Sequence, residues 1–208
     1  LLAVFWKELA DHMGSRRFFI FFLIIALAGL WATYVAAQSI RGELAQTPTS
    51  RFVFIQIFTA STGLLPPFVS FIGFFGPLVG LALGFDAINR ELSEGTLSRV
   101  RSQPLYRDSV INGKFLAGVT TIAMMLLSLV LLISGLGLQL IGVTPTLEEM
   151  LRLLIFVVIT VIYIAFWLGL SILFSILFRR TATSALGAIA LWIFFAFFML
   201  MISSRVSR

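Results

Sequence analysis

The chain has 208 residues, of which 60% are hydrophobic and only 12% are charged, and its mean hydropathy is +1.07. This composition is typical of an integral membrane protein and excludes a soluble globular domain. The formal net charge is +6, and the absence of cysteine excludes disulfides, thiol nucleophiles and cysteine-based metal sites.

Residues 1–15 predict an amphipathic helix that lies along the inner surface of the membrane. The apolar residues of this stretch recur at helical spacing: Leu2, Phe5, Leu9 and Met13. Lys7, Glu8 and Asp11 fall away from this apolar face, and Trp6 is placed to anchor the helix at the interface. A surface anchor and a partner-docking helix explain the pattern about equally well.

Five apolar stretches are long enough to cross a bilayer, since about 20 helical residues span the hydrocarbon layer. They lie near 18–38, 64–85, 115–138, 151–178 and 182–202. The sequence therefore predicts an all-α protein, a polytopic helical bundle that forms one transmembrane domain over residues 1–208. The apolar stretch at 51–63 is too short to cross and is followed by two prolines, which indicates an interfacial or re-entrant piece on the outer side.

The second predicted span carries three glycines at four-residue spacing: Gly76, Gly80 and Gly84. Two successive GxxxG steps leave a groove on one helix face, into which another helix can pack closely. Helix packing, within one subunit or between two, explains these glycines better than a substrate site does.

A polar segment at 86–114, between the second and third predicted spans, holds nine of the chain's 24 charged residues, which are 15 basic and nine acidic in total. Its local pattern predicts that the second span continues to Gly95, that Thr96 caps a short helix and that Pro104 ends it. Taken alone, the charges favour an ordinary solvated loop whose arginines snorkel along the membrane surface.

Before the fourth predicted span, Glu148 and Glu149 resemble a carboxylate pair for acid–base chemistry, but the spacing argues for another role. Thr146 and Glu149 fit a capping box, in which a hydroxyl and a carboxylate bind the free amides at a helix start. His12, the only histidine, has no second candidate ligand nearby, so a metal role is not expected. We therefore expect no catalytic site, metal or cofactor in this chain.

The distribution of Lys and Arg predicts the orientation, because basic loops are retained on the cytoplasmic side. Ten of the 15 basic residues lie on the side that holds the N-terminus and the 86–114 segment. We expect this side to face the cytoplasm, in the inner (plasma) membrane. The positive net charge then reflects topology and contact with anionic lipid, and it gives no argument for nucleic acid as a partner.

An energy source for transport is missing from the sequence. The predicted spans hold no ionisable residues at membrane depth, where proton- and ion-coupled transporters usually keep them. A nucleotide-binding loop is also missing, because Gly113 and Lys114 lack an upstream glycine and are followed by Phe115. If the chain moves anything, it needs an outside energy source, and the 86–114 segment is the candidate contact with that source.

One pattern in this segment is specific. It consists of Asp86, Arg90, Glu91, Gly95, Thr96 and Leu97, then Ser102, Gln103, Pro104 and Arg107, and then Gly113 to Leu116. The pattern resembles the permease subunits of type-2 ABC exporters. Within that class it resembles the branch that contains the permeases of nitrous-oxide-reductase copper maturation and of gliding motility. The similarity covers the topology of nearly the whole chain, but the distinctive motif spans only about 35 residues.

The resemblance implies a membrane subunit that pairs with a second copy or a paralogue and docks separate cytoplasmic ATPase subunits, where ATP and Mg²⁺ would bind. It also implies a coupling helix that contacts the ATPase, with these residues: Glu91, Glu94, Gly95, Thr96, Leu97, Arg99, Val100, Arg101, Gln103, Pro104 and Arg107. Residues 1–13 would form the interfacial helix of that fold. Such permeases have six spans and five are predicted here; one explanation is that the chain is an incomplete stretch of the polypeptide.

The sequence thus favours the permease subunit of an ATP-driven exporter, and it does not indicate the substrate. A membrane scaffold that passes ATPase motion to a partner on the outer side fits the same features. A membrane-embedded enzyme acting on lipid is a further alternative, but it needs convergent carboxylates, histidines or metal ligands, and the sequence offers only scattered charges.

Overall fold

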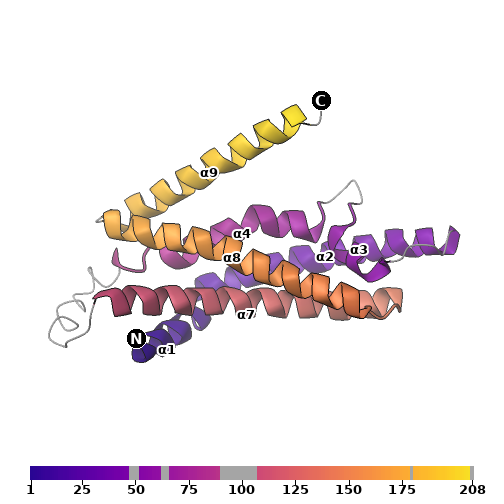
Figure 1. The fold of residues 1–208 in the computed structure, drawn as a ribbon, viewed down its shortest axis with the longest axis horizontal. Helices are drawn as coiled ribbons and strands as arrows, with labels where there is room; N and C mark the ends of the chain where they lie inside the picture. Colours follow the sequence, from indigo (N-terminus) through magenta and orange to yellow (C-terminus); the bar gives the residue numbers. More distant parts are fainter. Residues whose placement is uncertain (47–51, 62–65, 90–106, 179, 207–208) are drawn as a thin grey trace. The chain divides into compact units, whose positions relative to one another are not determined.

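The computed structural model describes residues 1–46, 52–61, 66–89, 107–178 and 180–206 (Figure 1). Within these ranges the regular elements are all helices and no strand occurs, which confirms the predicted all-α fold. The helices are α1 (Leu2–Met13), α2 (Arg16–Gln46), α3 (Val53–Thr59), α4 (Phe68–Gly84), α7 (Arg107–Ile141), α8 (Leu147–Leu177) and α9 (Thr181–Val206).

In the described part of the chain, four helices are long and apolar enough to cross a membrane. The qualifying stretches are 16–42 of α2, 109–141 of α7, 147–177 of α8 and 181–198 of α9. They coincide with the first, third, fourth and fifth predicted spans. The second predicted span coincides with α4, which has only 17 residues. Such a helix is about 26 Å long, slightly less than a hydrocarbon layer of about 30 Å.

The chain divides into two compact units. The first unit consists of residues Leu1–Phe18, Pro77–Ile122 and Tyr163–Arg208, and the second consists of Phe19–Gly76 and Ala123–Ile162. The boundaries between the units fall inside α2, α4, α7 and α8, so each of these helices contributes to both. The single transmembrane domain expected over 1–208 stays a prediction.

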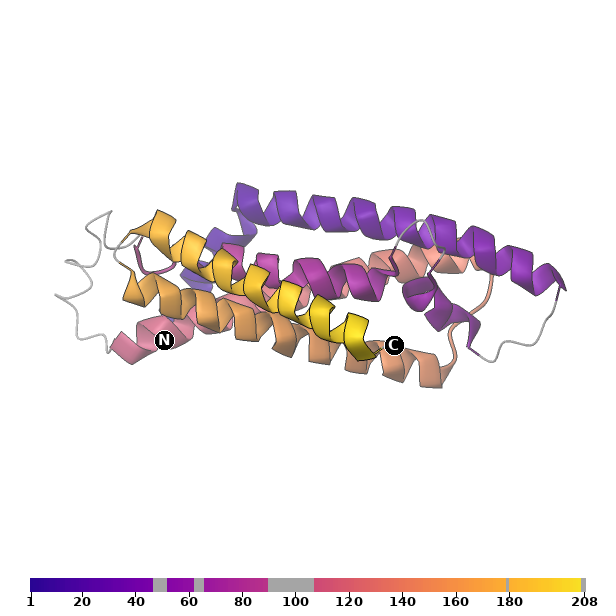
Figure 2. The same cartoon turned by 90° about the horizontal axis from the view of Figure 1, so that it is seen from above.

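Close contact between α4 and α8 holds the first unit together. A Cβ atom on Gly80 would lie 2.7 Å from the carbonyl oxygen of Ile164, and one on Gly84 would lie 2.9 Å from that of Leu168. Gly76, the remaining glycine of the predicted stripe, is buried. Three side chains from α4, α8 and α9 form an apolar core beside this contact: Leu81, Trp167 and Ala188. The start of α9 lies next to the end of α8 (Figures 1 and 2).

Replacing Gly80 by valine should destabilise the protein, because the new side chain would have to displace the backbone of α8. Overpacking of this kind costs about 1–3 kcal/mol. Thermal unfolding of the purified protein in detergent measures the loss. Gly73→Val on the same helix is the control, since a Cβ atom there meets nothing within 4 Å. Equal losses in the two variants would contradict the close approach of α4 and α8.

In the second unit, a single carboxylate joins α3 to the start of α8. Oε2 of Glu149 accepts a hydrogen bond from the amide of Thr146 (2.9 Å), and the Thr146 hydroxyl oxygen accepts one from the Glu149 amide (3.3 Å). This confirms the predicted capping box. Oε1 of Glu149 accepts two more hydrogen bonds, from the amides of Phe54 (2.9 Å) and Ile55 (3.2 Å) at the start of α3. The buried carboxylate of Glu149 therefore holds α3, which lies within the short apolar segment predicted at 51–63, against the start of α8.

Candidate functional site

The predicted coupling residues lie mostly outside the part of the chain that the structure describes. The ten in this position are Glu91, Glu94, Gly95, Thr96, Leu97, Arg99, Val100, Arg101, Gln103 and Pro104. Arg107 is the first residue of α7. The structure does describe the two flanks of this segment, which are residues 85–89 after α4 and the first turns of α7 as far as Lys114. The candidate site consists of these flanks and the groups that hold them.

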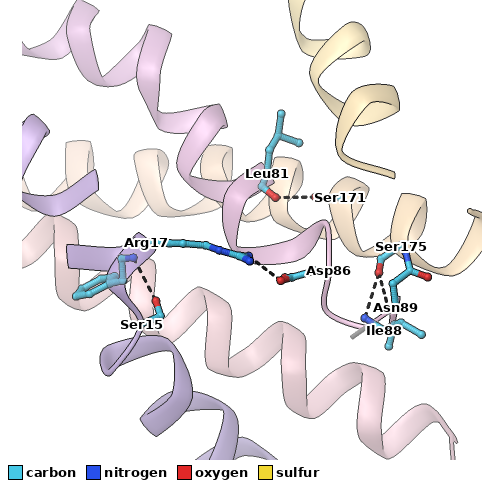
Figure 3. Close-up of polar contacts among 9 residues, drawn as sticks. Ser15, Arg17, Leu81, Asp86, Ile88, Asn89, Ser171 and Ser175 are labelled. Carbon is cyan, nitrogen blue, oxygen red and sulfur yellow. Dashed lines mark hydrogen bonds and ion pairs between the residues drawn. The ribbon is translucent and has the colours of Figure 1, made fainter. Parts of the chain in front are cut away.

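The first flank is held by two serine hydroxyls of α8 (Figure 3). The Ser171 hydroxyl donates to the carbonyl oxygen of Leu81 (2.9 Å), inside the last turns of α4. The Ser175 hydroxyl oxygen accepts from the amides of Ile88 (3.1 Å) and Asn89 (3.3 Å). Both serines are buried, so each hydroxyl satisfies backbone groups that water would not reach.

The prediction that the second span continues to Gly95 is wrong at its first step. α4 ends at Gly84, and residues 85–88 form a turn in which the Ala87 amide donates to the Gly84 carbonyl (3.1 Å). The cause is long-range, because Ser175 binds the amides that a continuing helix would have paired with its own carbonyls. Sequence periodicity carries no information on that competing acceptor.

A charged pair connects the first flank to the start of α2. Arg17 Nη1 lies 2.6 Å from Asp86 Oδ2 (Figure 3). The same guanidinium lies 5.0 Å from the ring centre of Phe85. The Asp86 side chain is 16% exposed and that of Arg17 is 52% exposed. The Ser15 hydroxyl oxygen accepts from the amide of Phe18 (3.2 Å) and so caps the helix that carries Arg17.

A second charged pair connects the other flank to α1, and this pair is buried. Lys114 Nζ lies 2.7 Å from Glu8 Oε1, and the two side chains are only 4% and 11% exposed. Burial by itself would raise the pKa of the Glu8 carboxyl, but the hydrogen bond and the charge of Lys114 outweigh it and lower the pKa below its usual value. Gly113 lets α1 approach closely, since a Cβ atom there would lie 3.0 Å from Val4.

The two flanks are thus linked through the same short stretch of chain. Asp86 is bound by Arg17 and Lys114 is bound by Glu8, and both partners belong to residues 1–18. We call these four side chains the anchor pairs. They attach residues 1–18 to both ends of the 86–114 segment.

A cavity of about 500 Å³ lies beside the anchor pairs, inside the first unit. We call it the α1 cavity, because α1 supplies half of its charged and histidine side chains. These side chains are Lys7, Glu8, Asp11, His12, Arg16, Arg17, Asp86 and Lys114. Burial lowers the pKa of the His12 imidazole, against the opposing effect of Glu8, so His12 is neutral at pH 7.

Sequence reasoning missed Ser171, Ser175 and Asn89. The two serines stand four residues apart in an otherwise apolar run, which places them on one helix face, and this spacing was the available signal. Asn89 is 3% exposed, and neither polar atom of its carboxamide has a hydrogen-bond partner in the described ranges. It is the last described residue before the segment at 90–106.

Comparison with known families gives one match over nearly the whole chain. Residues 2–208 match a family described as ABC-2 family transporter protein. A comparison with curated proteins found no match.

Proposed function

Since the chain belongs to the ABC-2 transporter family, we propose that a separate cytoplasmic ATPase drives it and that the 86–114 segment receives the motion of that ATPase. The chain is an integral membrane protein, the permease component of an ABC transporter, and its family implies an ATP-binding partner. The proposal adds where the partner acts and how its motion enters the membrane helices.

The anchor pairs carry this proposal. When the ATPase displaces the segment between the flanks, the displacement acts on Asp86 at one end and on Lys114 at the other. Both side chains are bound to residues 1–18, so the displacement reaches the interfacial helix α1 and the start of α2 together. Ser175 passes the same displacement to α8. Coupling of this kind needs contiguous rigid contacts, and hydrogen-bonded charges between helices provide them.

The remaining features of the proposal follow the resemblance and the charge distribution. The N-terminus lies in the cytoplasm, in the inner (plasma) membrane, and the subunit pairs with a second copy or a paralogue. ATP and Mg²⁺ bind in the ATPase, and this chain holds no catalytic site. The output is export across the membrane, and the protein belongs to the branch of the copper-maturation and gliding-motility permeases.

Charge reversal in the coupling segment tests the proposal. Glu94→Arg and Arg101→Glu should each weaken binding of the ATPase about tenfold or more, because a like charge replaces an opposite one in the contact. Co-purification from native membranes and ATPase activity in the purified complex give the two readouts. Arg180→Glu is the matched control, since Arg180 is an exposed arginine outside the segment. If both reversals leave co-purification and ATP hydrolysis at the level of this control, the coupling segment is wrongly assigned.

A further inference from the structure

In α1, the charged residue Glu8 is buried against the protein, while several apolar residues of the same helix are exposed. Glu8 is 8% exposed, whereas Leu2 is 71% and Trp6 is 64% exposed. An exposed tryptophan beside exposed aliphatic side chains is typical of a helix at the level of the lipid headgroups. The α1 cavity lies on the charged side of this helix, where α2 begins and α4 ends. The cavity is therefore at headgroup level as well.

Part of the positive charge around the cavity is already neutralised. Four cationic side chains line it against three carboxylates. Arg17 is held by Asp86 at 2.6 Å, and Lys114 is held by Glu8 at 2.7 Å. These two cations are therefore committed to the anchor pairs.

The other two cations are available. Lys7 lies 3.5 Å from Glu8, which Lys114 already binds, and 3.8 Å from Asp11, whose side chain is 60% exposed. Arg16 is exposed and has no ion-pair partner within the described ranges. Loose ion pairs at an exposed surface are worth little. The cavity thus offers a guanidinium and an ammonium to an anion from outside.

Other parts of the cavity wall are apolar. Leu83, Leu168 and Ile172 line the cavity and are 7%, 1% and 4% exposed. A ligand that fits such a site combines a negative charge with apolar groups, and the volume of about 500 Å³ lies within the range of about 300–1,000 Å³ found for small-molecule sites. Membrane lipids with an anionic headgroup have this chemistry and are present at this level of the membrane.

We propose that the α1 cavity binds the headgroup of an anionic phospholipid, with the phosphodiester held between Arg16 and Lys7 and the glycerol end of the lipid against Leu83 and Ile172. Basic pockets between membrane helices are known to hold anionic headgroups, and arginine suits a phosphate because it donates two parallel hydrogen bonds. Occupancy would strengthen the contact of α1 with α2 and α4 next to the anchor pairs. The site needs no ATPase, so it stands independently of the coupling proposal.

A lipid titration tests the site. The protein is purified in neutral detergent with any ATP-binding subunit that stays bound, and its unfolding temperature is followed while short-chain phosphatidylglycerol is added. We expect a saturable rise, because a ligand that binds only the folded state stabilises it. Phosphatidylcholine of the same chain length should give no such rise. Arg16→Gln should raise the half-saturating concentration about tenfold or more, because it removes the charged hydrogen bonds that the guanidinium donates to the phosphate.

Arg180→Gln is the matched control, because it removes the same charge from an exposed arginine outside the cavity. It should leave the titration unchanged. An Arg16→Gln variant that keeps the wild-type curve would overturn the site. An equal rise with phosphatidylcholine would overturn the recognition of an anion. A rise of the same size with inorganic phosphate alone would assign the cavity to a free phosphate and overturn the lipid headgroup as its ligand.

Discussion

Lys114→Met is expected to destabilise the protein by about 3–5 kcal/mol, the usual cost of removing one partner from a buried ion pair. The loss arises because Glu8 keeps its negative charge in a place that water hardly reaches, with the Lys114 and Glu8 side chains 4% and 11% exposed. Thermal unfolding in detergent should show a much lower midpoint than for the wild type. Lys7→Met, the same change at the other lysine of the chain, should lose far less, because the Lys7 side chain is 64% exposed.

The double variant Glu8→Gln/Lys114→Met is the decisive control. It removes both charges, so no isolated charge stays buried, and it should regain most of the lost stability. A double variant no more stable than Lys114→Met would show that the lysine acts through packing of its side chain, and the ion-pair account of this contact would be wrong.

The contribution of Glu8 to folding stability should change with pH in opposite directions in the wild type and in Lys114→Met. In the wild type the pKa of Glu8 is lowered, so its contribution to stability is present above the usual value of 4.5 and is lost as the pH falls through the lowered pKa. Without Lys114, burial raises the pKa of the Glu8 carboxyl. Protonation of Glu8 then removes the buried charge that destabilises the variant. The difference in unfolding temperature between the wild type and Lys114→Met should therefore become smaller as the pH falls from about 8 towards 4.5.

Glu149→Ala is the second substitution with a large expected effect, again about 3–5 kcal/mol, because each hydrogen bond to a charged group contributes about 1.5–3 kcal/mol and such terms are not additive. Glu149 is 2% exposed and accepts hydrogen bonds from the amides of Phe54, Ile55 and Thr146 and from the Thr146 hydroxyl. Alanine leaves the buried Phe54 amide without its acceptor. Faster amide hydrogen exchange in α3 and a lower unfolding temperature are the measurements.

The neighbouring Glu148→Ala gives the comparison for this experiment. Glu148 is exposed and pairs only with Arg152, one helical turn away, in the described ranges. Its loss should cost about 0.3–0.5 kcal/mol. Similar effects of the two alanine substitutions would mean that Glu149 does not hold α3 in place.

Local patterns predicted those parts of the fold that depend on neighbours in sequence. Composition and apolar length predicted an all-α membrane protein, and four of the five predicted spans coincide with helices of spanning length. The capping box of Thr146 and Glu149 was predicted from residues three positions apart. The same carboxylate also binds Phe54, 95 positions away, and no local pattern indicates that contact.

The anchor pairs show the same limit at the candidate site. Glu8 belongs to the charged side of an amphipathic helix, and this pattern alone favours exposure to water. It is buried because Lys114, 106 positions later, supplies the opposite charge. The end of α4 was misplaced for a similar reason, since Ser175 competes for its amides from another helix. Pairings between helices distant in sequence depend on the packed structure and leave no periodic signal.

The two anchor pairs differ in their access to water, and this makes salt concentration an experimental variable for the coupling segment. The Arg17 side chain is 52% exposed, so dissolved ions screen its attraction to Asp86, whereas the side chains of Lys114 and Glu8 are largely shielded from them. Concentrated salt therefore loosens one end of the segment and leaves the other end attached. Assays in dilute and in concentrated salt therefore compare the same protein with the 86–114 segment held at both ends and with it held mainly at the Lys114 end.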